Sequence, residues 1–174
     1  KTKMKFLAPF LYPLTLILDK FAFGGCEAII TSGRLHHPYL KRVTNKSLEI
    51  LYPGCNPLDK LPDFSLRQNI IFTYDRWDIG NIPNLYLDIL GSLGNSKIRL
   101  VIGGFWHPSS LKESFLKEIK KKNLGSQVEL LGPLGEERIK DLCSKAMVHV
   151  HHNEEAFGMQ SLEAAACGCP IIIP

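Results

Sequence analysis

The chain has 174 residues, 45% of them hydrophobic, so it is long enough to bury the core of one domain, or of one domain with part of another. Its net charge of +4 lacks the dense stripe of lysine and arginine that nucleic-acid binding needs, which excludes nucleic acid as the expected partner.

The first predicted element is a helix over residues 6–20. The apolar run from Phe6 to Leu18 contains two prolines and is shorter than the roughly 20 residues of a membrane-spanning helix. We expect this segment to pack on a core or to contact a membrane surface, in a cytoplasmic protein. The five cysteines are odd in number and lack the paired spacing of a zinc site, so reduced thiols are expected in the same compartment.

Strands at 27–32 and 48–53 follow, with a helix at 34–43 between them. Residues 52–65 then contain three prolines and no periodicity, which indicates a linker. We therefore expect residues 1–66 to be the end of one domain with its linker, and residues 67–174 to be a second, incomplete domain of a longer protein.

Strands and helices alternate through the second half of the chain. Further strands are predicted at 69–74, 98–103, 128–132, 147–152 and 170–173, and helices at 83–93, 109–123, 135–145 and 159–167. Such alternation predicts an α/β fold with a parallel sheet and right-handed crossovers. Ligands of these sheets lie beyond the carboxyl ends of the strands, which directs attention to the loops at 75–81, 104–109, 132–137 and 153–160.

The last of these loops leads into a helix that begins near Gly158. The free N–H groups of a helix start suit phosphate or hydroxyl oxygens, and a glycine there lets a ligand approach the backbone. Glu163, in the early turns, has a carboxylate able to accept two hydrogen bonds from a vicinal diol such as a ribose. Glu155 precedes the helix and can face another part of the ligand. By spacing alone, both acids are equally well explained as surface residues.

Two further sets of residues are candidates for a site. His149 and His151 share one face of a predicted strand, but no acidic or cysteine ligand has matching spacing, so no metal is expected there. Trp77 and Trp106 are predicted to follow the strands that end at 74 and 103. Packing is the favoured explanation for both tryptophans, with stacking on a base as the alternative.

The stretch "EAFGMQSLEAAACGCPIIIP" resembles the E-x7-E signature of the retaining glycosyltransferases of the GT-B fold, in glycosyl transferase group 1, family 4. The pattern matches at Glu155, Phe157, Gly158, Glu163, Ala164, Ala166, Gly168 and Pro170. The resemblance extends back through "LGPLGEERIKDLCSKAMVHVHH" and "IIFTYDRWDIGNIPNLYLDIL" to "EILYPGCNPL". It implies a Rossmann-like C-terminal donor domain, truncated, preceded by the tail of an N-terminal acceptor-side domain.

The resemblance also implies roles for individual residues. Glu163 would bind the ribose of a nucleotide-diphosphate sugar, and Glu155 the hydroxyls of the transferred sugar. The backbone from Phe157 through Gly158 and Met159 to Gln160 would lie against the sugar and the diphosphate. Gly103 and Leu131 would flank the base. Arg76 would meet the departing diphosphate, without a metal or other cofactor.

One departure from the family pattern concerns the diphosphate. The family commonly has a glycine before the arginine and a lysine five residues after it, whereas this chain has Asp75 and Asn81. Loss of a cation would weaken stabilisation of a charged leaving group. The resemblance therefore predicts an enzyme that transfers a hexose, mannose or glucose, from a GDP or UDP donor to a glycan or lipid-linked acceptor held by the missing domain. The alternatives are a catalytically impaired or regulatory nucleotide-sugar-binding domain, and a flavodoxin-like domain, which "TYDRWDIGN" does not support.

Overall fold

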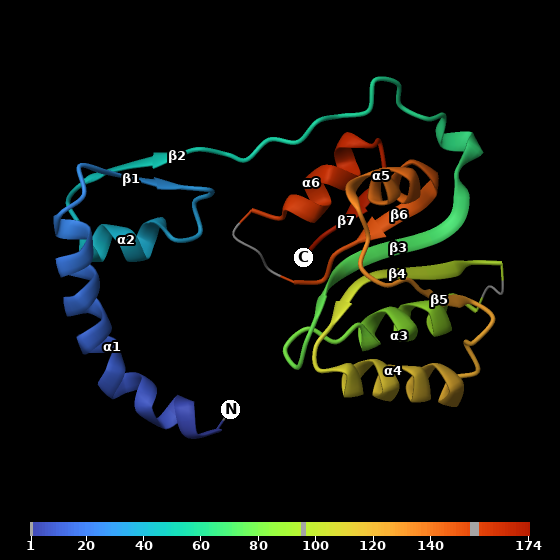
Figure 1. Cartoon of the computed structure of the whole chain (residues 1–174), viewed down its shortest axis with the longest axis horizontal. Helices are drawn as coiled ribbons and strands as arrows, with labels where there is room; N and C mark the ends of the chain where they lie inside the picture. Colours follow the sequence, from blue (N-terminus) through green and yellow to red (C-terminus); the bar gives the residue numbers. More distant parts are fainter. Residues whose placement is uncertain (1, 95–96, 154–156) are drawn as a thin grey trace. The chain divides into compact units, whose positions relative to one another are not determined.

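The computed structural model describes residues 2–94, 97–153 and 157–174, with side chains from residue 11 onward (Figure 1). Contacts divide the chain into two units. One runs to Gly54, and the other begins at Cys55 and excludes a short stretch before Gly158. The boundary predicted at residues 66 and 67 stays a prediction, because it concerns domains of a longer protein.

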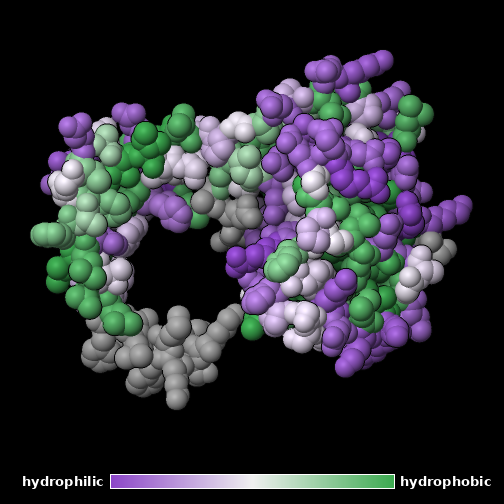
Figure 2. Space-filling view, viewed as in Figure 1, coloured by the Kyte–Doolittle hydropathy of each residue, from purple (hydrophilic) through white to green (hydrophobic). Residues whose placement is uncertain are grey.

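The first unit contains two helices and a parallel pair of strands. These elements are α1 (Thr2–Gly24), β1 (Ala28–Thr31), α2 (His37–Val43) and β2 (Ser47–Ile50). Apolar side chains of α1 lie on the surface (Figure 2): Leu11, Tyr12, Leu14, Ile17, Leu18 and Phe21. Among the described residues, no helix combines the length and apolarity that crossing a membrane requires.

The second unit is an α/β fold with a five-stranded parallel sheet, as predicted. Its strands are β3 (Gln68–Trp77), β4 (Arg99–Trp106), β5 (Val128–Leu130), β6 (Ala146–Val150) and β7 (Ile171–Ile172). Its helices are the short η1 (Phe64–Leu66), then α3 (Asn84–Leu93), α4 (Ser109–Lys121), α5 (Glu136–Lys145) and α6 (Met159–Ala166). The spatial order of the strands is β5-β4-β3-β6-β7.

Helices cover both faces of this sheet (Figure 1). Alternate residues of the central strands feed two cores, because successive side chains of a strand point to opposite faces. Leu100 and Ile102 pack with side chains of α3 and α4, such as Leu87 and Phe115. Phe72 and its neighbours on the other face pack with side chains of α5 and α6.

Strands β3 and β4 extend three residues further than the sequence pattern predicted, so the expected strand ends at residues 74 and 103 were wrong. The two tryptophans placed in loops, Trp77 and Trp106, are register partners inside the sheet and are buried, which confirms the packing role. Gly104 makes the extension possible: its φ is +120°, and a β-carbon there would lie 1.9 Å from the carbonyl oxygen of Asp75.

Candidate functional site

The strand order places the topological switch point of this fold, the crevice of doubly wound sheets, between β3 and β6. The chain passes from β3 outward through β4 to β5, then returns to the other side of β3 as β6 and β7. The loops that follow β3 and β6 therefore diverge, and this topological switch point is where doubly wound sheets bind ligands. The segments that meet there are the end of β3 with its loop to Asn81, and the start of α6.

Helix α6 begins at this point through a glycine. Gly158 precedes the helix with φ +81° and ψ +55°, a left-handed conformation that glycine adopts without steric cost. Met159 and Gln160 form the first turn. The N–H groups of such a first turn have no partners within the helix, and they attract oxygen ligands.

A tyrosine of β3 is hydrogen-bonded to Glu163. The hydroxyl of Tyr74 donates to Oε2 of Glu163 at 2.5 Å. Tyr74 is buried, and its burial, followed by the hydrogen bond to Glu163, raises the pKa of the phenol. The hydroxyl therefore stays protonated at neutral pH and acts as a donor. One carboxylate oxygen of Glu163 is thus fixed by the protein.

Asp75, the residue after Tyr74 in β3, accepts hydrogen bonds from residues on both sides of the crevice. Its Oδ2 accepts from Nδ2 of Asn81 at 2.7 Å and from Nδ2 of Asn153 at 3.5 Å. Its Oδ1 accepts from Nε2 of Gln160 at 3.2 Å and from the backbone N–H of Arg76 at 2.6 Å. The carboxylate of Asp75 therefore ties the loop after β3 to the first turn of α6.

The side chain of Arg76 does not join this cluster. Its guanidinium is 75% exposed and contacts Asp78, with Nη2 and Oδ2 3.3 Å apart. An exposed ion pair of this kind contributes little to stability, so the side chain is free to reorient toward an anion. Asn81, at the lysine position of the family pattern, donates to Asp75 and also to the carbonyl oxygen of Arg76, at 3.1 Å.

The other predicted site residues lie on neighbouring elements. Gly103 of β4 pairs in register with Tyr74, and a β-carbon there would lie 2.3 Å from Cδ1 of Leu134. Leu131 follows β5 and donates its N–H to the carbonyl oxygen of Ile102 at 2.8 Å. Phe157 leads directly into Gly158. Glu155 lies outside the described residues.

The two histidines considered as metal ligands are both buried. His149 belongs to β6, and His151 directly follows that strand. His149 is fully buried beside the rings of Phe72 and Tyr74, with centroids 6.0 Å and 5.7 Å away. Burial, with His151 nearby, lowers its pKa to about 4, so the ring is neutral at pH 7. Among the described residues, no group of three histidine, cysteine or acidic side chains is arranged to hold a metal ion.

Sequence reasoning missed Tyr74 and the linking role of Asp75. Both were signalled by position: Tyr74 follows Phe72 at the strand period of two, on the face that α6 covers, and Asp75 stands next to the predicted Arg76. The partner Glu163 is 89 residues away in the sequence, so the pairing itself is set only by the order of the strands.

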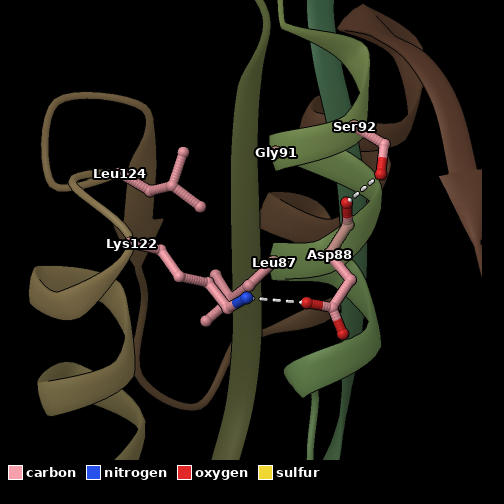
Figure 3. Close-up of a pocket in the computed structure, with 6 residues that line it drawn as sticks. All are labelled: Leu87, Asp88, Gly91, Ser92, Lys122 and Leu124. Atoms are coloured by element: carbon pink, nitrogen blue, oxygen red, sulfur yellow. Dashed lines mark hydrogen bonds and ion pairs between the residues drawn. The ribbon is translucent and has the colours of Figure 1, made fainter.

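A hollow lies between α3 and α4, away from the carboxyl ends of the strands (Figure 3). It is lined by Leu87, Asp88, Gly91, Ser92, Lys122 and Leu124, and has a volume of about 370 Å³. The side chain of Lys122 crosses the hollow, and its Nζ lies 2.8 Å from Oδ1 of Asp88. This exposed ion pair satisfies the charged groups of the hollow, so the crevice between β3 and α6 is the stronger candidate.

The fold and the crevice define the second unit as a Rossmann-like α/β domain with its polar site at the topological switch point. The model of the family described as glycosyl transferases group 1 matches residues 62–173, and the chain belongs to that family. No curated protein sequence matches the chain significantly.

Solved structures of GT-B glycosyltransferases share the fold. HepE of Anabaena, solved with UDP and glucose, is 14% identical, with a TM-score of 0.72 over 89% of this chain and 46% of its own. Sucrose-phosphate synthase of Thermosynechococcus elongatus is 21% identical, with a TM-score of 0.70 over 91% of this chain and 43% of its own. The pneumococcal O-GlcNAc transferase GtfA, solved with UDP and GlcNAc, is 20% identical, with a TM-score of 0.62 over 84% of this chain and 30% of its own. The chain thus spans less than half the length of these proteins.

Proposed function

We propose that this chain is the donor-binding part of a retaining glycosyltransferase that takes a hexose from a nucleotide-diphosphate sugar, with a UDP-sugar as the favoured donor. The observation that carries the proposal is Glu163, the second glutamate of the family motif, held by Tyr74 at the switch point. HepE and GtfA, solved with UDP and a sugar, support UDP over GDP as the nucleotide. Glucose and mannose both remain as the transferred sugar.

Each residue of the crevice then has a role. The free oxygen of Glu163 accepts from a ribose hydroxyl, and the first turn of α6 from Gly158 to Gln160 faces the sugar and the diphosphate. Phe157 and Met159 flank that turn, and Gly103 and Leu131 flank the base. Glu155, outside the described residues, is assigned to the hydroxyls of the transferred sugar.

Sugar transfer develops positive charge on the sugar ring while the diphosphate departs, and the enzyme must stabilise both. Positioned donors at a helix start act on charge as it develops, and here α6 supplies them. Arg76 exchanges its exposed contact with Asp78 for the diphosphate. The glycan or lipid-linked acceptor is assigned to an N-terminal domain, of which residues 1–66 are the proposed tail.

Donor binding tests the proposal directly. Isothermal titration of this chain with UDP-glucose, UDP-GlcNAc and GDP-mannose is expected to detect at least one complex. Glu163→Gln is expected to weaken that complex about 10- to 100-fold, because it replaces a charged acceptor with a neutral amide. Tyr74→Phe is expected to weaken it about threefold to tenfold by leaving the carboxylate unfixed.

Glu137→Gln is the matched control. Glu137 is a carboxylate in the first turn of α5, and its side chain is 93% exposed, so its replacement is expected to leave the donor affinity unchanged. The proposal fails if no nucleotide-sugar binds, or if Glu163→Gln behaves like Glu137→Gln.

A second candidate is a nucleotide-sugar-binding or regulatory domain with little transfer activity. The hydrogen bond between Asn81 and Asp75 favours it, since no cation stands at the lysine position of the family pattern. Asn81→Lys in the longest natural chain that contains these residues separates the two. A large gain in transfer rate with little gain in donor affinity identifies an impaired enzyme, whereas no gain in rate favours a binding domain.

A further inference from the structure

The hydrogen bonds of Asp75 fix the orientation of two side-chain amides in the crevice. Asn81 and Gln160 both turn an NH₂ group to the carboxylate, at 2.7 Å and 3.2 Å. An amide that donates on one side presents its oxygen elsewhere. Asp75 therefore fixes which way both amides face, and each amide turns its oxygen away from the carboxylate.

Within the described part of the chain, the oxygens of these two amides have no hydrogen-bond partner. Oδ1 of Asn81 and Oε1 of Gln160 are both buried, and neither is within hydrogen-bond reach of a donor among the described residues. A buried polar atom without a partner destabilises the protein, and for an amide oxygen only a hydrogen-bond donor relieves this cost. A sugar hydroxyl is such a donor, whereas the oxygens of a diphosphate only accept. Both oxygens are shielded from water, so a hydroxyl reaches them only if neighbouring atoms move aside.

The negative charge of the Asp75 carboxylate also favours a sugar over a diphosphate. All four groups that donate to Asp75 are neutral amides, and the nearest guanidinium in sequence, that of Arg76, contacts Asp78 instead. The carboxylate thus places a negative charge beside the first turn of α6, where the positive end of the helix would otherwise act on an anion alone. A free nucleoside diphosphate carries more negative charge on its terminal phosphate than a nucleotide-sugar does, so it meets the stronger repulsion at this point.

We propose that Asp75 is a specificity-determining and positioning residue, which makes the crevice take the hydroxyl-bearing sugar of a donor in preference to the free nucleoside diphosphate. It rests on the proposed function and deepens it, since it names the residue that makes the site prefer the intact donor. For a transferase, such a preference favours loading of the intact donor and release of the spent nucleotide.

The experiment compares UDP with UDP-glucose, or with whichever nucleotide-sugar binds best, by isothermal titration of this chain. The wild-type chain is expected to bind the nucleotide-sugar at least about tenfold more tightly than the free nucleotide. Asp75→Gly is expected to raise the affinity for the free nucleotide about tenfold, by removing one charge at short range, and to lower the preference for the sugar at least about threefold. High salt is expected to shrink the gain for the nucleotide, because salt screens charge.

Two more variants keep the test decisive. Asp75→Asn has nearly the shape of the native residue without its charge, so it serves if the glycine variant is poorly folded by circular dichroism. Asp88→Asn removes an equal charge from the hollow between α3 and α4 (Figure 3), and is expected to leave both affinities unchanged.

The outcomes separate the two proposals. If nucleotide-sugars bind but the ratio of the two affinities is the same in the wild-type, Asp75→Gly and Asp75→Asn chains, the role of Asp75 is structural and this inference is overturned while the proposed function stands. If no nucleotide binds to any variant, both are overturned.

Discussion

One carboxylate oxygen of Glu163 accepts a hydrogen bond from within the protein. Tyr74 holds Oε2, and its raised pKa keeps the phenol protonated, so the carboxylate cannot swing away from the sheet without breaking a charge-assisted hydrogen bond. A carboxylate that is already oriented loses less side-chain entropy when a ligand binds. The orientation of the Glu163 carboxylate is therefore set by the protein itself.

His149 makes the stability of the second unit depend on pH. The side chain is 0% exposed, and burial lowers its pKa to about 4, compared with about 6.5 in the unfolded chain. The unfolded chain therefore binds a proton at higher pH than the folded chain. The stabilisation is present above pH 6.5 and is lost as the pH falls toward 4. Urea unfolding is expected to show a loss of about 2 kcal/mol from this residue between pH 7 and pH 5.

A variant without the imidazole isolates this effect from the carboxylates that also titrate. His149→Leu keeps a buried apolar side chain between the same rings and cannot take up a proton. Its free energy of unfolding is expected to change less between pH 7 and pH 5 than that of the wild-type chain. An equal change in both chains would show that His149 does not contribute.

At the scale of whole elements, Arg67 joins the ends of two helices. Its Nη1 donates to the carbonyl oxygens of Cys143 and Ala146 at 2.8 Å and 2.7 Å, at the end of α5. Its Nη2 donates to those of Cys167 and Gly168 at 3.4 Å and 2.7 Å, at the end of α6. A cation at a helix carboxyl end satisfies unpaired carbonyls and interacts favourably with the macrodipole. The residue before β3 thereby fixes α6, on which Glu163 lies.

Replacing Arg67 is expected to destabilise the second unit. Arg67→Met keeps much of the aliphatic stem but leaves four carbonyl groups without their donor, at a cost of about 2–3 kcal/mol in urea unfolding. Arg99→Met is the control, because Arg99 is 49% exposed and its contact with Glu129 is worth less than about 1 kcal/mol. Equal losses in the two variants would show that the helix-end contacts of Arg67 add nothing.

The sequence pattern found these elements but not all of their ends. β-branched and apolar runs mark strands wherever they lie, so all five strands of the second unit were predicted. The ends of β3 and β4 were missed because Asp75 and Gly104 resemble loop residues, while Trp77 and Trp106 reveal their strand positions only through each other. Glu163 and Gln160 were proposed as site residues through the motif, and their roles stay predictions. Tyr74 was not, since its role depends on α6 packing against the face it shares with Phe72.

At the scale of the whole molecule, buried residues are unequally shared between the two units. Leu40 and Val43 are the only hydrophobic residues of the first unit that are buried, among those whose side chains are described, whereas the second unit buries two extensive clusters. Stability follows the apolar area removed from water. The first unit is therefore expected to be much less stable than the second.

This inequality predicts two unfolding transitions in urea, the first unit unfolding at the lower concentration. Truncating a buried Leu or Ile to Ala costs about 2–5 kcal/mol, and each variant moves only the transition of the unit that contains it. Leu40→Ala is expected to shift or abolish the first transition, and Ile102→Ala to shift the second, as followed by circular dichroism and by the fluorescence of Trp77 and Trp106, which both lie in the second unit. A single transition that both variants shift alike would show one cooperative domain, because units that unfold independently do not share a midpoint.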